Sequence, residues 1–257
     1  MAGSMQESDM RISTTTDMKR RTFKKILAGL AGAVILFVLV VVVNLLIVNK
    51  DQEKISQGKR IKEYEDPQPA LLIIDIQEAT TGEYSLYPFF RSNAENLLLN
   101  LNRAIDNFNQ HQLPVIYVKS EITNPLINLI NNSYAKGSAS ADFDRRLNLV
   151  SDLLVSKKVK DAFRNTPLDS LLMSNRVNEI YVAGVDAAEC VNATVQAALN
   201  RGYKIHILKD AALSKSQAAT DSMMLVFNRM GTSVIITDSL VHHLGLGHSG
   251  KFQPVPE

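Results

Sequence analysis

Two kinds of hydrophobic pattern divide the chain. Residues 26–48 form an unbroken apolar segment whose one strongly polar member is Asn44. As a helix, this segment would be about 34 Å long, enough to cross a bilayer core of about 30 Å. Beyond residue 67, short apolar runs alternate with stretches of helical periodicity. The pattern predicts one transmembrane helix followed by a doubly wound α/β domain with a mostly parallel sheet.

Charges on either side of the apolar segment predict its orientation. The amino side is crowded with basic residues, namely Lys19, Arg20, Arg21, Lys24 and Lys25. On the far side, Lys50 and Lys54 are offset by two acids, although three more basic residues further out even the count. The positive-inside rule therefore places the amino end in the cytoplasm and the main domain outside it. A cleaved signal peptide is the alternative, but the apolar run is long and no small-x-small cleavage site follows it.

The domain boundaries follow from composition. We expect a cytoplasmic basic tail over 1–25, the transmembrane helix over 26–48, a charged and solvated stalk over 49–66, and one folded domain over 67–257. Residues 121–152 are rich in Asn and Ser and show no clear elements. In the rest of the domain, strands are expected at 70–77, 113–120, 153–158, 178–185, 204–212 and 233–238, with helices beginning at the capping box Ser92-x-x-Glu95 and spanning 168–175, 186–202 and 216–230.

The lone cysteine, Cys190, falls in a short turn between a buried strand and a helix. In the first turn of a helix, free backbone N–H groups and the helix dipole favour a thiolate and could also hold an oxyanion. The neighbouring acids Asp186 and Glu189 act against this, because carboxylates raise a thiol's pKa. A buried, inert cysteine is therefore the alternative to a nucleophile.

Two other polar residues occupy equivalent places. Asp75 and Lys119 each stand at the carboxyl end of an expected parallel strand, as Cys190 does. In a doubly wound sheet these ends converge on one crevice. We therefore expect Asp75, Lys119 and Cys190 to meet as a carboxylate, an ammonium and a thiol, which together suit nucleophilic catalysis.

Composition excludes several other classes. The 28 Lys and Arg nearly balance the 26 Asp and Glu, which gives no reason to expect a nucleic-acid partner. One cysteine rules out an intramolecular disulfide framework, and the five histidines show no metal-ligand spacing. We expect neither a metal nor another cofactor.

Four segments in order resemble the isochorismatase-like cysteine hydrolases, a family that includes nicotinamidases and carbamoyl-amide hydrolases. They are LLIIDIQ around Asp75, VIYVKS around Lys119, KKVKDAFRNTPLDSLL at 157–172, and VAGVDAAECVNATVQAALNRGY around Cys190. The resemblance covers about residues 68–240 and implies a Rossmann-like fold of the isochorismatase type. Within this family, sheet-covering helices often mediate self-association, so a homo-oligomer is an open expectation.

The resemblance also implies an Asp-Lys-Cys triad acting on a small-molecule amide through a thioester. Cys190 would be the nucleophile, Asp75 its acid/base, and Lys119 the group that favours their ionised forms. It implies a cis peptide bond before Asp186, with an oxyanion hole made by the backbone N–H groups of Asp186 and Cys190. For contact with the substrate, the expected side chains are Gln77, Tyr84, Tyr87 and Phe89, with Phe90 beside them; the alternative for the aromatics is that they pack the loop onto the core.

Departures from the family keep other hypotheses open. The family usually has Thr where this chain has Ala187, and Ser where it has Asp161. No histidine lies between 78 and 110, which argues against a metal-dependent nicotinamidase. A catalytically silent binding domain of the same fold is the first alternative, and vinyl-ether hydrolysis of the isochorismatase type is the second.

Overall fold

A computed structural model describes residues 3–244, so the extreme ends of the expected tail and domain, 1–2 and 245–257, lie outside it. The chain divides into two units, residues 1–49 and 50–257. The first is built on helix α1 (Gly3–Gln52), in which Phe23–Gln52 are long and apolar enough to cross a membrane. The apolar stretch is exposed along its length, and a signal sequence would have the same length and composition.

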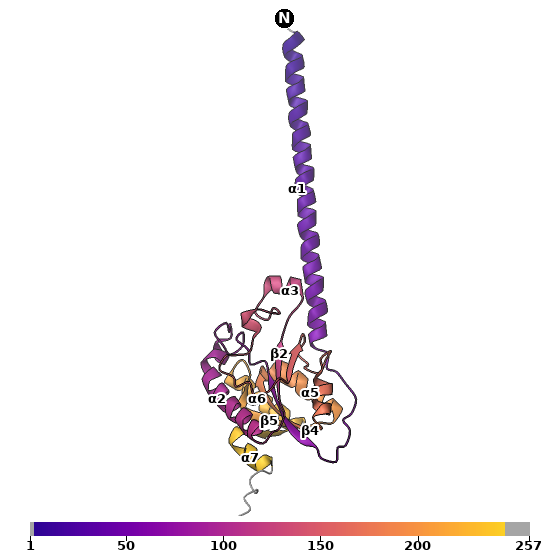
Figure 1. Ribbon diagram of the computed structural model, residues 1–257. Coiled ribbons are helices and arrows are strands. Elements are labelled where there is room, and N and C mark those ends of the chain that lie inside the picture. Colours follow the sequence, from indigo (N-terminus) through magenta and orange to yellow (C-terminus); the bar gives the residue numbers. More distant parts are fainter. Residues whose placement is uncertain (1–2, 245–257) are drawn as a thin grey trace, which may run out of the picture. The chain divides into compact units, whose positions relative to one another are not determined.

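The second unit is built on a single six-stranded sheet in which every neighbouring pair is parallel. The sheet order is β3-β2-β1-β4-β5-β6, which confirms the doubly wound α/β fold (Figure 1). The strands are β1 (Gln68–Ile74), β2 (Val115–Ser120), β3 (Leu154–Lys157), β4 (Val177–Val185), β5 (Lys204–Leu213) and β6 (Ser233–Ile235).

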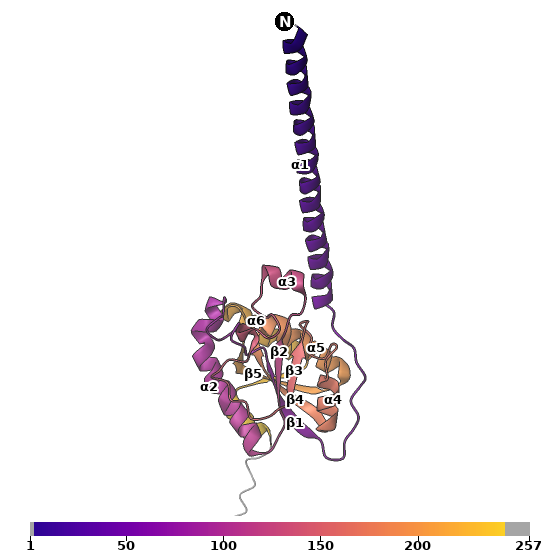
Figure 2. The ribbon, with the colours of Figure 1, turned by 45° about the horizontal axis from the view of Figure 1, so that its top comes forward.

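Helices bury both faces of the sheet, because alternate residues of the central strands point to opposite sides. On one face, Leu71 and Ile73 join the apolar residues of α2 (Pro88–Gln110) and α7 (Leu240–His243). On the other face, Leu72 and Ile74 join those of α4 (Leu168–Ser174), α5 (Asn192–Arg201) and α6 (Gln217–Arg229). The remaining short elements are α3 (Pro125–Ile130), the turns Ala139–Ala141 and Thr237–Ser239, and the π-helical turn Ala187–Val191; Figure 2 shows the layers from a second side.

Helix α2 begins four residues earlier than its expected capping box. Its first residue is Pro88 and its N-cap is Tyr87, with no side-chain cap. Proline suits this position because the first N–H of a helix has no partner within the helix. The Ser92 hydroxyl donates instead to the carbonyl of Pro88, inside the helix, so the predicted capping box is wrong.

Residues 53–66, which the sequence suggests form a solvated stalk, are mostly exposed but also contact the domain. Ile55 and Ile61 pack against the core on the α5 side of the sheet. The Ser56 N–H donates to buried Asp161 at 2.8 Å, and the Ile61 N–H donates to the carbonyl of Arg201 at 2.9 Å. Partly buried isoleucines and backbone hydrogen bonds therefore attach a segment whose composition favours solvent.

The central strands meet where the chain reverses its direction of winding. It runs outward through β1, β2 and β3, then returns to place β4 beside β1. Gly184 permits the close approach, since its φ is +127° and an added Cβ would lie 2.1 Å from the Ile74 carbonyl oxygen. The carboxyl ends of β1 and β4 therefore border the crevice in which α/β sheets bind ligands.

Candidate active site

Asp75 directly follows β1 and is held by the backbone around it. Its φ is +55°, an uncommon value for a residue other than glycine. Its N–H donates to the Val118 carbonyl at 2.8 Å, and the Thr80 hydroxyl donates to its carbonyl at 2.6 Å. Only 4% of the residue is exposed, so its carboxylate must find partners inside the protein.

Lys157, the last residue of β3, provides the main partner. Its Nζ lies 2.8 Å from Asp75 Oδ2, 2.8 Å from Ser120 Oγ and 3.2 Å from Cys190 Sγ. The Ser120 hydroxyl in turn donates to Asp75 Oδ1 at 3.0 Å. Lys157 is 1% exposed, so one buried ammonium joins the carboxylate to the thiol.

Cys190 reaches this group from the turn after β4. The turn Ala187–Val191 is π-helical and leads into α5, and Asp186 caps it by accepting the Ala188 N–H at 2.9 Å. The peptide bond between Val185 and Asp186 is cis, as the family resemblance implies. Cys190 is partly exposed and lines a cavity of about 330 Å³.

The lysine expected in this group, Lys119, lies elsewhere, and this prediction is wrong. Its Nζ is 3.1 Å from Glu121 and 3.6 Å from Asp142. Neighbouring residues of a strand point to opposite faces, so when Ser120 faces Asp75, Lys119 cannot. The same alternation of side chains could have identified Lys157. It follows buried Val155 by two residues, at the carboxyl end of an expected strand.

Only some of the residues expected to contact the substrate line the cavity. Tyr87 does, and so does Phe90, whereas Tyr84 and Phe89 are absent from the lining. Gln77 is fully buried, and its amide is bound to the Ser120 backbone and the Ala141 carbonyl, so it is occupied in holding β2 and the 141 loop. Tyr134 also lines the cavity. Sequence reasoning missed it because residues 121–152 carry no periodic pattern.

Comparison with known proteins agrees with this geometry. The profile of the isochorismatase domain matches residues 69–239. The chain belongs to the isochorismatase family. It is 26% identical to the N-carbamoylsarcosine amidase of Arthrobacter over 190 residues, covering 68% of this chain and 71% of that one. It is 27% identical to the uncharacterized isochorismatase family protein YddQ of Bacillus subtilis over 157 residues, covering 60% and 83%.

Solved structures of the family share the fold. The N-carbamoylsarcosine amidase of Thermoplasma acidophilum superposes with a TM-score of 0.58 at 25% identity, covering 66% of this chain and 97% of that one. An isochorismatase-like hydrolase from Alkaliphilus metalliredigens gives a TM-score of 0.60 at 22% identity, covering 69% and 98%. The second unit is thus an isochorismatase-family hydrolase domain.

The charges in this isochorismatase-type site determine where the proton resides. Burial, with the Asp75 carboxylate second, raises the pKa of Cys190 to about 12, although Lys157 acts in the opposite direction. For Lys157, burial disfavours the charged form, but Asp75 and Cys190 outweigh it and raise the pKa of the ammonium. In the resting site, therefore, the thiol keeps its proton and the lysine stays charged.

The acids close to Cys190 are paired at the mouth of the cavity. Glu189 forms an ion pair with Lys160, and Lys215 lies 3.7 Å from Asp186 and 4.0 Å from Glu189. These lysines offset the two acids that argued against a reactive cysteine. Within residues 3–244, no group of three or more His, Cys, Asp or Glu side chains is arranged to hold a metal ion.

The resting protonation state can be tested on the lone cysteine. Asp75→Asn removes the carboxylate that raises the pKa of Cys190 but leaves Lys157 in place, so we expect the thiol pKa to fall below that of the wild type. The pH profile of iodoacetamide labelling should shift to lower pH. Asp142→Asn, which removes an exposed carboxylate away from the thiol, should leave the profile unchanged. A shift to higher pH in Asp75→Asn would contradict this account of the charges.

Proposed function

We propose that the domain hydrolyses a small amide or related C–N bond through a thioester on Cys190. The observation that carries this proposal is the position of the Lys157 ammonium, within 3.2 Å of both the Asp75 carboxylate and the Cys190 sulfur. A nucleophile, an acid/base and a fixed cation in one cavity are the components of acyl transfer. The similarity to N-carbamoylsarcosine amidase supports an amide as the substrate class.

In the first half of the reaction, Asp75 accepts the thiol proton while Sγ attacks the carbonyl carbon. The C–S bond forms and the carbonyl electron pair moves to oxygen. As the tetrahedral intermediate collapses, the C–N bond breaks and Asp75 gives its proton to the leaving amine. The products of this step are the free amine and a thioester on Cys190.

In the second half, Asp75 takes a proton from water as the water attacks the thioester. The C–S bond breaks, the carboxylic acid leaves, and the proton returns from Asp75 to the sulfur. Lys157 keeps its proton throughout, because the adjacent anions raise its pKa. Its fixed positive charge stabilises the thiolate as it forms, when Asp75 has become neutral.

The negative oxygen of the intermediate needs donors close to Sγ. We assign this role to the backbone N–H groups of Asp186 and Cys190, at the two ends of the turn that carries the nucleophile. The turn is fixed by Asp186, which accepts hydrogen bonds from the Ala188 N–H and the Ser214 hydroxyl. Preorganised donors of this kind typically contribute about 10²- to 10³-fold to the rate.

The cavity favours a compact substrate with one apolar side. Its volume of about 330 Å³ is at the small end of ligand sites. Tyr87, Phe90 and Tyr134 form the aromatic wall, and burial, with Tyr87 beside it, raises the pKa of Tyr134, so its hydroxyl stays neutral. Lys160 and Lys215, which pair with Glu189 and Asp186, give the mouth its charged groups.

Two lysine variants distinguish the proposed triad from the one expected from sequence. Lys157→Met should lower kcat/KM on any amide that the wild type hydrolyses by about 10²- to 10³-fold, the range for removing one preorganised group that stabilises developing charge. Lys119→Met should stay within a few-fold of wild type, because Lys119 pairs with Glu121 and Asp142. The Cys190→Ala variant gives the background rate of hydrolysis without the nucleophile. Equal activity of wild type and Lys157→Met would refute the triad.

The silent domain remains the competing hypothesis, and the raised pKa of Cys190 is the observation in its favour. A silent domain would turn over no member of a small-amide panel, and Cys190→Ala would behave as the wild type does. Isochorismatase-type vinyl-ether hydrolysis would appear instead as pyruvate release. The amide panel and a vinyl-ether substrate, each with Cys190→Ala alongside, therefore separate all three hypotheses.

We also propose that α1 anchors the hydrolase domain to a membrane, with the amino end in the cytoplasm. Support comes from the exposed apolar stretch within Phe23–Gln52, whose mean hydropathy is 3.2 in its most apolar window. The five basic residues between 19 and 25 precede it. A membrane span with this flank favours an amino end inside.

A membrane-anchored chain and a chain whose leader peptide is cleaved would differ in mass and in their association with the membrane. An anchored chain should stay in the membrane pellet after alkaline carbonate extraction and keep an intact mass that includes residues 1–48. A cleaved leader would release a soluble domain that lacks them. An engineered pair of Arg residues in the apolar segment, such as Val40→Arg with Leu39→Arg, should weaken pelleting of an anchored chain.

A further inference from the structure

The segment between β2 and β3 carries an exposed apolar helix, α3. None of its six residues is buried, and the side chains of Leu129 and Ile130 leave these residues 71% and 60% exposed. Figure 1 and Figure 2 both show α3 standing away from the sheet, beyond β2. Residues 122–141 contain no acidic residue and a single basic one, Lys136. Adjacent exposed aliphatic residues at a nearly uncharged tip indicate a surface that contacts another molecule.

The projection that carries α3 is folded. The side chain of Asn124 caps the first turn of the helix. At the base of the projection, the Ile122 N–H donates to the Tyr134 carbonyl at 2.6 Å, and the Lys136 N–H donates to the Ile122 carbonyl at 3.1 Å. An ordered backbone therefore presents the exposed aliphatic side chains to the outside of the domain.

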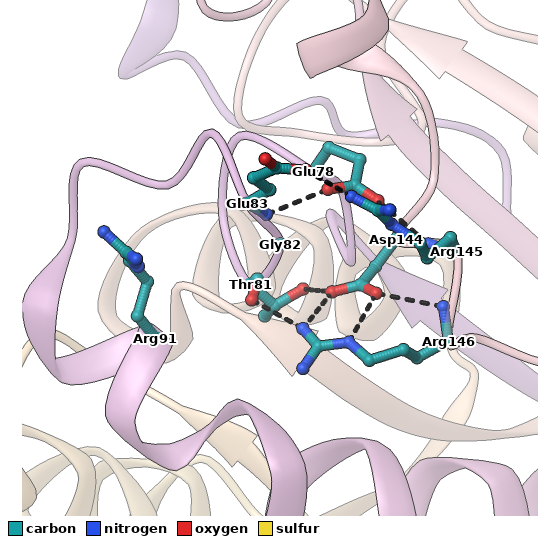
Figure 3. A pocket seen from close by; sticks show the side chains of 8 residues that line it. All are labelled: Glu78, Thr81, Gly82, Glu83, Arg91, Asp144, Arg145 and Arg146. Atoms are coloured by element: carbon teal, nitrogen blue, oxygen red, sulfur yellow. Dashed lines mark hydrogen bonds and ion pairs between the residues drawn. The ribbon is translucent and has the colours of Figure 1, made fainter.

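The loop after Asp75 is a second surface near the active site, and it differs from α3 in its charges. Its Glu78 accepts the Arg145 Nε at 3.3 Å, and on the facing segment Asp144 accepts the Arg146 Nη2 at 2.7 Å (Figure 3). These charged groups neutralise one another within the domain. Helix α3 carries no charged side chain, so removing it from water costs comparatively little.

Residues 51 and 52, at the start of the second unit, are fixed to the loop that follows β3. The Gln52 amide binds this loop at both ends: its Nε2 donates to the Lys158 carbonyl at 3.0 Å, and its Oε1 accepts the Lys160 N–H at 3.0 Å. Asp51 pairs with Arg164 at 2.6 Å. The point at which the chain enters the domain therefore has a defined place on its surface.

This attachment limits how far the domain can lie from a membrane that holds the apolar segment. From Val48, the end of that segment, to Gln52 the chain takes four steps, which span at most about 14 Å when fully extended. The limit holds for any orientation of α1. Lys160, which binds Gln52, and Tyr134, at the base of the projection, both line the active-site cavity. The edge of the sheet that bears the cavity and α3 therefore lies close to the membrane surface.

We propose that α3 inserts Leu129 and Ile130 into the interface of the membrane that holds α1. The inference rests on the proposed membrane anchor and is independent of the proposed hydrolysis. Apolar side chains at a membrane surface settle about 5–10 Å into the boundary between headgroups and acyl chains. With α3 as a second attachment beside the anchor, the mouth of the active-site cavity faces the bilayer. Substrates dissolved in the interface then reach Tyr134 directly from the membrane.

The test places a fluorophore at one position of the full chain in phosphatidylcholine vesicles, which contain a lipid with a nitroxide quencher on its acyl chain near the headgroup. Cys190→Ala removes the lone cysteine, and Leu129→Cys supplies the labelled position. Met173→Cys is the control, because this half-exposed residue of α4 lies just before the start of β4, at the opposite edge of the sheet. Leu46→Cys reports on the apolar segment itself.

We expect the nitroxide lipid to cause a loss of fluorescence at positions 129 and 46, and none at position 173. Adding Ile130→Asp should reduce the loss at 129, because a charged side chain opposes insertion. Far-UV circular dichroism of each labelled variant shows that it is folded.

Three results would overturn the proposal. Quenching at 46 with no more quenching at 129 than at 173 would place α3 in water while leaving the anchor intact. No quenching at 46 would remove the anchor and α3 insertion together. Quenching at 129 that Ile130→Asp leaves unchanged would show that α3 lies near the lipid without inserting into it.

Discussion

The site depends on one buried cation. Lys157 is almost completely inaccessible to solvent, and desolvating an ammonium costs several kcal/mol unless charged and hydrogen-bonded partners surround it. Asp75, Ser120 and Cys190 supply those partners, all within 3.2 Å of Nζ. The same contacts that make the buried charge tolerable also bring the sulfur to the carboxylate. Stability and chemistry in this domain therefore rest on the same set of hydrogen bonds.

The sheet topology makes this cluster possible. Asp75 follows β1, Ser120 ends β2, Lys157 ends β3 and Cys190 follows β4. In a parallel sheet these four ends share one edge, and the reversal of winding between β1 and β4 opens a crevice there. Gly184 permits the close backbone approach of β4 to Ile74 at the end of β1. Loops then add further groups to the cavity, such as Tyr134 and the charged residues at the mouth.

Much of this was predictable from the sequence. Every strand was expected near its observed place, as were the strand-end positions of Asp75 and Cys190, because buried parallel strands leave a strong apolar signal. The lysine was misplaced because β2 and β3 each carry a lysine in their last two residues, Lys119 and Lys157, and only the alternation of side chains along the strands shows which one faces the site. Tyr134 was missed because its loop has no periodicity, and the contacts of Ile55 and Ile61 with the domain could not be read from the charged composition of 53–66. These outcomes depend on tertiary packing, which local patterns do not encode.

The central claim is that Cys190, supported by Asp75 and Lys157, carries the acyl group during turnover. The most direct test is intact-mass spectrometry of the full chain, acid-quenched during turnover of an amide substrate. We predict an added mass equal to the acyl fragment, located on the peptide that contains Cys190 and removed by neutral hydroxylamine, as a thioester requires. Turnover with no adduct on that peptide, or with an adduct on a different residue, would contradict the account.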